Sequence, residues 1–163
     1  MAGTGVGCQS QPQETDPAGA QKASVKVVDR QEQETALRQL LSDQQEAWNQ
    51  GDLVGFMAGY AKTDTLRFAS GGSVRTGWQE TLDNYRSGYP DRAAMGELTF
   101  DLIDIEVMTT EWALIFGRWT LERESDRPSG LFTLIAHRNG PSSEWKIVHD
   151  HTSSNPAEET ESD

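Results

Sequence analysis

The distribution of aromatic residues limits what this chain can fold into. All five Trp, three Tyr and five Phe lie between Trp48 and Trp145, and the first 30 residues contain none. Aromatic side chains supply much of the apolar area that a core buries. A segment without them buries too little apolar surface to offset the entropy lost on ordering. We therefore expect a disordered segment over residues 1–30, one folded domain over residues 31–153, and an acidic disordered segment over residues 154–163.

The charge balance and the cysteine content exclude several classes of function. The chain of 163 residues has 14 Lys and Arg against 26 Asp and Glu, a net charge of −12. Residues 31–153 have a net charge of −8, because the first 30 residues are neutral overall and the last ten carry four acids and no base. We therefore expect no nucleic-acid partner, no binding to anionic membranes and, without a long apolar run, no membrane insertion. A single cysteine also excludes an intramolecular disulfide.

The segment around that cysteine, Cys8, leaves the compartment open. The sequence MAGTGVGCQSQPQETDPAG resembles the end of a bacterial lipoprotein signal followed by its tether, with Gly7 before the cysteine. Gly5 stands where Leu is usual, and the segment lacks the basic and apolar regions of a signal. The alternatives are a periplasmic lipoprotein anchored at Cys8 after an upstream signal is trimmed, and a cytoplasmic protein with a free thiol.

Helical periodicity dominates the first half of the domain. Residues 34–50 place apolar side chains at the three-to-four spacing of one helical face. Asp52 is a helix-capping residue type and is expected to begin a second helix. Residues 66–70 read as a short strand, and a third helix follows, which Pro90 ends.

Strands follow these helices. Their predicted ranges are 98–108, 112–122, 130–138 and 144–153. The first alternates apolar and polar residues, but the alternation changes phase between Leu102 and Ile103, which predicts a β-bulge. The strand over 112–122 is apolar on both faces and is expected to be central. The predicted fold class is α+β, with three N-terminal helices packed on a strongly curved antiparallel sheet.

This order of elements, together with two specific strings, resembles the nuclear transport factor 2-like superfamily. EAWNQGDLVGFMAGYAKTDTLRFASGG resembles the opening of the SnoaL-like and calcium/calmodulin-dependent kinase II association-domain families, and WKIVHDHTSS resembles the closing strand of that association domain. The resemblance covers residues 34–153. It implies a cone-shaped domain, a pocket at its open end and, usually, a dimer formed through the sheet. It does not imply one activity, because the superfamily includes isomerases, cyclases, dehydratases, transport adaptors and hub domains.

Ketosteroid isomerisation is the best-known reaction on this fold, and the sequence argues against it here. That reaction uses a carboxylate base and an oxyanion hole made of a tyrosine and a protonated aspartate. By ungapped matching, the tyrosine position falls on Gln44, the base on Phe68 and the protonated acid on Phe132. None of these side chains transfers a proton, so we expect no ketosteroid isomerase chemistry.

The resemblance does imply a ligand pocket. Arg118 interrupts the apolar strand and matches a pocket arginine of the association domain, whose two further pocket arginines match Leu134 and Thr152 here. The resemblance also places the face of Val148, Asp150 and Thr152 in the pocket. Asp150 is thus the expected partner of Arg118, since a buried unpaired charge is very costly. The predicted ligand-binding residues are Arg118, Asp150, Tyr89, Tyr85, Phe132, Phe68 and Thr152. The alternative is that Arg118 and Asp150 form a structural ion pair that binds nothing.

Three histidines, His137, His149 and His151, lie on the predicted final hairpin. The H-x-H spacing places two imidazoles on one strand face, which suits a metal only with a third ligand. The candidates for this ligand are His137 and acids such as Asp104 or Glu106. We favour buried, hydrogen-bonded histidines at a dimer seam, and expect no metal. No phosphate-cradling glycine motif is present, so we also expect no cofactor.

These features favour a small homodimeric domain whose mostly apolar pocket binds a carbonyl- or carboxylate-containing small molecule. One alternative is a SnoaL-like isomerase or cyclase, in which Asp150 is the proton acceptor. The other is a purely structural dimerisation module.

Overall fold

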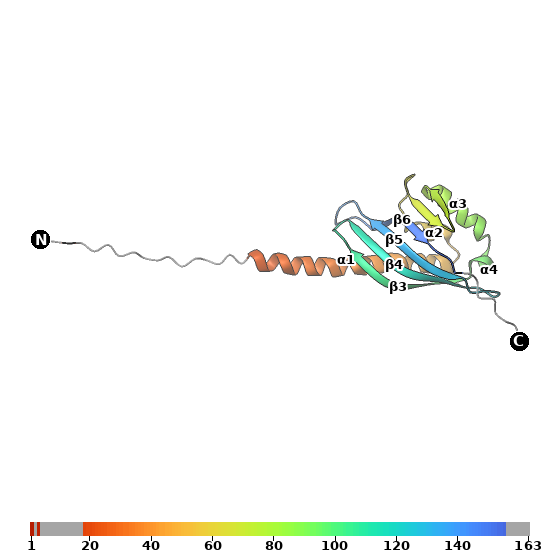
Figure 1. Ribbon diagram of the computed structural model, residues 1–163, viewed down its shortest axis with the longest axis horizontal. Coiled ribbons are helices and arrows are strands. Elements are labelled where there is room, and N and C mark those ends of the chain that lie inside the picture. The colour runs from red at the N-terminus through yellow and green to blue at the C-terminus, as the bar shows by residue number, and fades with distance from the viewer. Residues whose placement is uncertain (2, 4–17, 156–163) are drawn as a thin grey trace.

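The computed structural model describes residues 1, 3 and 18–155. A six-stranded sheet curves around helices that lie against one of its faces (Figure 1). In chain order the elements are α1 (Ala18–Asn49), α2 (Leu53–Met57), β1 (Arg67–Ser70), β2 (Ser73–Thr76), α3 (Trp78–Gly88), α4 (Arg92–Met95), β3 (Glu97–Val107), β4 (Trp112–Glu122), β5 (Ser129–His137) and β6 (Lys146–Thr152). The predicted α+β class is confirmed. Cys8 and residues 156–163 lie outside the described residues, so the lipoprotein anchor and most of the acidic segment stay predictions.

Helix α1 begins at Ala18, well before the predicted start at residue 34. Residues 18–30, for which the sequence predicts disorder, continue this helix beyond the end of the sheet (Figure 1). Residues 18–30 include three Ala and two Lys, residue types that extend an existing helix at little cost.

The strand order is β2-β1-β6-β5-β4-β3, antiparallel except for the parallel pair β1–β6. Strand β4 lies between two neighbours, as predicted for an apolar central strand. The bulge in β3 is also confirmed, because the pairing with β4 shifts register between Leu102 and Asp104. The sequence did not predict β2: Gly71 and Gly72 adopt positive φ values of 56° and 77° and return the chain along β1.

A second register shift, between β5 and β6, decides which residues of β6 face inward. Ala136 pairs with Ile147 and Ile135 pairs with His149, so Val148 is an extra residue on β6. The shift places Ile147 and Asp150 on the inner face. Simple alternation predicts that Ile147 shares a face with His149, and that prediction is wrong, because the bulge changes the alternation.

Helix α1 covers the edge strand β3. The side chain of Asn49 accepts from the Leu98 N–H at 2.7 Å and donates to the Leu98 carbonyl at 2.9 Å, and Gln45 accepts from the Phe100 N–H at 2.7 Å. These bonds satisfy backbone groups that an edge strand would otherwise expose to pairing with other chains. The contacts also fix α1 across the sheet.

The core lies between α1, α2 and the inner face of the sheet. Its fully buried apolar side chains include Leu37, Leu41, Met57, Leu66, Ile115 and Ile147. Leu37 and Leu41 belong to the predicted buried face of α1. Among the described residues, no helix is both long and apolar enough to span a membrane.

Candidate functional site

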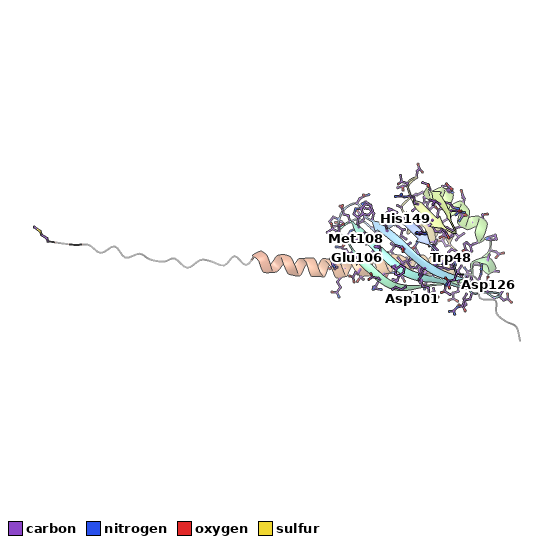
Figure 2. All side chains as sticks on the ribbon, in the orientation of Figure 1. Trp48, Asp101, Glu106, Met108, Asp126 and His149 are labelled. Carbon is purple, nitrogen blue, oxygen red and sulfur yellow. The ribbon has the colours of Figure 1, made fainter. Side chains whose placement is uncertain are left out.

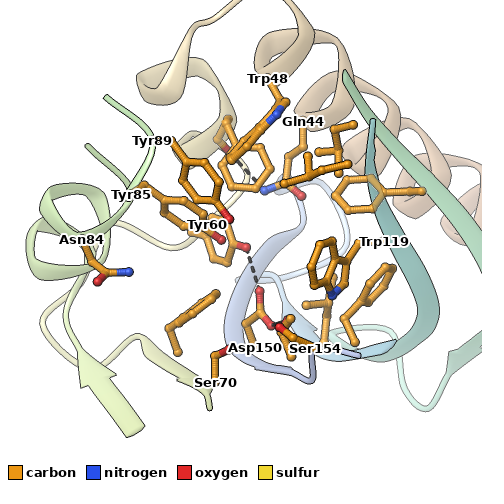
Figure 3. A pocket seen from close by; sticks show the side chains of 18 of the residues that line it. Gln44, Trp48, Tyr60, Ser70, Asn84, Tyr85, Tyr89, Trp119, Asp150 and Ser154 are labelled. Atoms are coloured by element: carbon orange, nitrogen blue, oxygen red, sulfur yellow. Dashed lines mark hydrogen bonds between the residues drawn. The ribbon is translucent and has the colours of Figure 1, made fainter. Parts of the chain in front are cut away.

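A cavity of about 340 Å³ lies between the helices and the inner face of the sheet (Figure 3). Its apolar walls comprise Leu41, Trp48, Phe56, Phe68, Leu98, Phe100, Trp119, Leu121, Phe132 and Leu134. The volume and the apolar lining are typical of a small-molecule site. The sequence builds this lining by alternation, since Trp119 and Leu121 point inward from β4, and Phe132 and Leu134 from β5.

An aromatic cluster forms the helical side of the cavity. The ring of Trp48 lies 5.1 Å from Phe56, 5.9 Å from Tyr85 and 4.8 Å from Tyr89, in each case edge to face. The Trp48 indole N–H donates to the Met95 carbonyl at 3.2 Å, which joins the cluster to α4. Edge-to-face pairs add stability beyond the buried area, so these contacts help to hold this wall together.

Asp150 forms the polar end of the cavity. The Tyr60 hydroxyl donates to its Oδ2 at 2.8 Å, and the Thr152 hydroxyl donates to its Oδ1 at 2.6 Å (Figure 3). The residue is only 3% exposed, and no salt bridge of the described residues includes it. A carboxylate has about four lone-pair sites, so two remain for a ligand.

Burial sets the protonation of this polar end. Desolvation raises the pKa of Asp150 to about 6, although the hydrogen bonds from Thr152 and Tyr60 and the nearby His151 act in the opposite direction. Burial, with the negative charge of Asp150, also raises the pKa values of Tyr60 and Tyr85 well above their usual value. The tyrosines therefore remain hydrogen-bond donors near neutral pH, while Asp150 changes charge near pH 6.

Six of the seven predicted ligand-binding residues line the cavity: Asp150, Tyr89, Tyr85, Phe132, Phe68 and Thr152. Arg118 does not, and the predicted Arg118–Asp150 pair is absent. Arg118 is exposed and lies next to Trp119, whose side chain points into the cavity, so Arg118 projects from the outer face of the sheet. In that position the guanidinium stays in water and avoids the cost of burial.

The cavity does contain an arginine that the sequence analysis missed. Arg75 on β2 lines the cavity together with Ser70, Ser73 and Asn84. Helical periodicity makes residues 73–76 read only as a lead into the third helix. The signal that could have found Arg75 is the Gly71–Gly72 pair, which is typical of a hairpin turn between two short strands.

One solved structure decides the family. An NTF2-like protein of unknown function from Shewanella oneidensis MR-1 is 41% identical, with a TM-score of 0.69, over 73% of this chain and 97% of that chain. The chain belongs to the NTF2-like family. No family model and no curated protein matches it.

Two more distant structures share the fold with this NTF2-like protein. A calcium/calmodulin-dependent protein kinase type II association domain from Thiobacillus denitrificans ATCC 25259 is 17% identical, with a TM-score of 0.61, over 72% of this chain and 93% of its own. The hexachlorocyclohexane dehydrochlorinase LinA-type3 from Novosphingobium barchaimii LL02 is 16% identical, with a TM-score of 0.65, over 80% of this chain and 92% of its own. The predicted resemblance to the superfamily is thus confirmed.

Within this NTF2-like domain, the three positions matched to ketosteroid isomerase all line the cavity. They hold Gln44, Phe68 and Phe132, none of which is an acid. Gln44 is buried, and its side-chain N–H donates to the Phe56 carbonyl at 3.0 Å. The acid of this cavity, Asp150, comes from a different strand position.

The three histidines are not buried within the single chain, and the predicted dimer seam stays a prediction. His137 and His149 are half-buried, His151 is exposed, and the β6 bulge turns both residues of the H-x-H pair to the outer face. Burial lowers the pKa of His149, and the charges of Arg67 and His151 lower it further. Within residues 18–155, no group of three or more His, Cys, Asp or Glu side chains could hold a metal ion.

Proposed function

We propose that this NTF2-like protein binds a small organic molecule with an apolar body and a polar group that hydrogen-bonds to Asp150. The observation that carries the proposal is a buried carboxylate without a cationic partner, facing a cavity with aromatic walls. At neutral pH this carboxylate accepts a hydrogen bond from a hydroxyl group. A carbonyl group would instead accept from protonated Asp150 or from a tyrosine hydroxyl.

The exposed position of Arg118 changes the expected ligand. A carboxylate placed against Asp150 would meet a like charge without the compensating guanidinium, which is unfavourable in a buried site. The polar group at this end of the cavity is therefore neutral. A hydroxyl or a carbonyl fits, and the carboxylate that the sequence predicts beside Arg118 does not.

The binding proposal can be tested with 2-naphthol and naphthalene, which share one apolar body and differ by one hydroxyl. We expect 2-naphthol to bind more tightly, because its hydroxyl donates to Asp150. Asp150→Leu should weaken 2-naphthol binding by about tenfold, the value of one buried hydrogen bond of ~1 kcal/mol or more. Isothermal titration calorimetry at pH 7.5 measures both affinities.

Asp101→Leu is the matched control, because Asp101 is an exposed acid of β3 and does not line the cavity. It should bind both probes as the wild type does. Equal affinity for the two probes in the wild type, or a hydroxyl preference that survives Asp150→Leu, would contradict the proposal. Failure of both probes to bind would favour the structural-module alternative.

Proton transfer is the second candidate function, and the pKa of Asp150 favours it. A carboxyl group with a pKa of about 6 is a suitable general base near neutral pH. The Tyr85 hydroxyl, whose pKa is raised, would donate a hydrogen bond to negative charge that develops on a carbonyl oxygen. This is the SnoaL-like isomerase or cyclase alternative, without a contribution from Arg118, which is exposed. Conversion of a bound ketone, in addition to binding, would identify the enzyme.

Homodimerisation through the outer face of the sheet is part of the proposed function. Alternate residues of β4 and β5 face inward, so the residues between them point outward. On this outer face Leu114 lies beside Ile135 and Phe116 beside Thr133. Exposed acids of β3, including Asp101 and Glu106, lie on one side of this apolar strip, and His149 lies on the other (Figure 2). Two copies related by a two-fold axis would bury this apolar strip against its own copy.

Phe116→Glu should dissociate this dimer, because two buried charges would meet in the apolar strip. Sedimentation velocity at 10 μM would then give the mass of one chain for the variant and two for the wild type. Val54→Glu is the control, since Val54 is a 50% exposed apolar residue on α2, away from the sheet. A wild-type protein that sediments as one chain would contradict the dimer.

A further inference from the structure

Arg75 and Asp150 lie in one row across three neighbouring strands. Arg75 of β2 is the register partner of Phe68 of β1, and Phe68 is the register partner of Asp150 of β6. All three line the cavity. Adjacent strands lie about 4.8 Å apart, which places the Arg75 and Asp150 Cα atoms about 10 Å from each other. The cavity therefore has a cation and an acid a fixed distance apart along one wall.

The Arg75 guanidinium has no hydrogen bond and no ion pair with another side chain in the described part of the chain. Arg123, which is also half-buried, pairs with Asp126 at 2.6 Å. The cavity is also lined by Ser70, Ser73 and Asn84, which are uncharged. A half-buried guanidinium is partly desolvated, so a group that restores its hydrogen bonds gains more there than at an exposed site.

The position of Arg75 argues against a structural role. Strand β2 is the edge of the sheet, and its residues are exposed apart from the half-buried Arg75. Loss of the Arg75 charge would uncover no part of the core. Its neighbour Phe68 is held on the other side by Tyr85, with ring centroids 5.7 Å apart.

We propose that Arg75 forms an anion subsite at the mouth of the cavity, so the ligand is amphiphilic. Its carboxylate pairs with Arg75, its aromatic or alicyclic body lies on Phe68, and its hydroxyl or carbonyl reaches Asp150. The planar guanidinium matches a carboxylate with two parallel hydrogen bonds. This inference rests on the proposed function, since it adds a second polar contact to the same cavity. The sequence predicts that Arg118 binds the carboxylate of the ligand. In this proposal Arg75, two strands from Asp150, binds it instead.

The test uses 6-hydroxy-2-naphthoate and its methyl ester, which carry a hydroxyl and either a charged or a neutral group at opposite ends of one body. In low salt at pH 7.5, calorimetry should show that the wild type binds the acid more tightly than the ester. Arg75→Gln should lower the affinity for the acid by about tenfold, as expected for one charge-assisted contact. The affinity for the ester should stay within twofold.

Two controls make the result specific. Arg118→Gln removes the same charge from the outer face and should leave both affinities unchanged. Arg75→Lys keeps the charge without the planar pair of donors and should retain part of the preference for the acid. A preference unaffected by Arg75→Gln, or lowered equally by Arg118→Gln, overturns the subsite while ester binding upholds the cavity proposal. If neither the acid nor the ester binds, both proposals are overturned.

Discussion

Asp150→Asn should gain stability relative to the wild type progressively as the pH rises from 4 to 7.5. The reason is that burial raises the pKa of Asp150 to about 6, from an ordinary value of 3.8. At neutral pH the folded wild-type protein must hold a desolvated carboxylate. Asparagine occupies the same volume without the charge. Urea unfolding of both proteins at several pH values measures the difference.

The direction follows from proton binding in the two states. Between pH 3.8 and 6 the folded state binds more protons at this site than the unfolded state, so the stability contributed by protonated Asp150 is lost as the pH rises. The full shift corresponds to about 3 kcal/mol. About 2 kcal/mol of it falls between pH 4 and 7.5, and the variant should gain that amount relative to the wild type.

The change with pH is the informative quantity. Asparagine has one side-chain oxygen for the two hydroxyls of Tyr60 and Thr152, and the lost hydrogen bond adds a cost of about 1 kcal/mol at every pH. Asp101→Asn, at an exposed position on β3, should show no comparable trend against the wild type. A constant difference between Asp150→Asn and the wild type across this pH range would show that the pKa of Asp150 is not raised.

A group that lowers stability at neutral pH needs another reason for its presence. Replacing buried charge by neutral groups of similar size is often neutral or stabilising in proteins. Two hydrogen bonds orient the Asp150 carboxylate at the end of a cavity, which is the arrangement expected of a group that contacts a ligand. The predicted penalty is thus consistent with the functional assignment.

The sequence predicted the parts of the fold that depend on local patterns. The spacing of Leu37, Leu41 and Trp48 defined the buried face of α1, and Asp52 caps α2 by accepting from the Gly55 N–H. The phase change in β3 located its bulge between Leu102 and Asp104. Each of these features involves only neighbouring residues along the chain.

Predicting the residues of the candidate site required knowing which face of the sheet lies inside. Local sequence patterns do not determine that face. Strand β4 is apolar on both faces, so alternation alone gave no reason to turn Trp119 rather than Arg118 inward. In the structure the larger aromatic group is inside and the charge is in water. Arg75 was missed for a related reason: the Gly71–Gly72 pair indicates a turn, but the face on which Arg75 lies follows from the pairing of β2 with β1.

Trp48→Ala should lower the free energy of unfolding by about 3–5 kcal/mol, the loss expected when a buried tryptophan is truncated. Trp48 is 2% exposed and contacts the rings of Phe56, Tyr85 and Tyr89, so the cavity left by its removal cannot collapse without moving two helices. The Met95 carbonyl would also lose its indole donor, which releases α4 from the cluster. Urea unfolding followed by circular dichroism at 25 °C measures the loss.

Two variants separate the contributions of the ring and of the indole N–H. Trp48→Phe keeps most of the packing and removes the bond to Met95, so it should cost only about 1–2 kcal/mol. Trp112→Ala removes the same side chain from the outer face, where it is 41% exposed, and should cost about 1 kcal/mol or less. Similar losses for Trp48→Ala and Trp112→Ala would mean that the wall of the cavity is not part of the stable core. In that case the cavity would be an adaptable surface, and its preference for an aromatic ligand body would have to arise on binding.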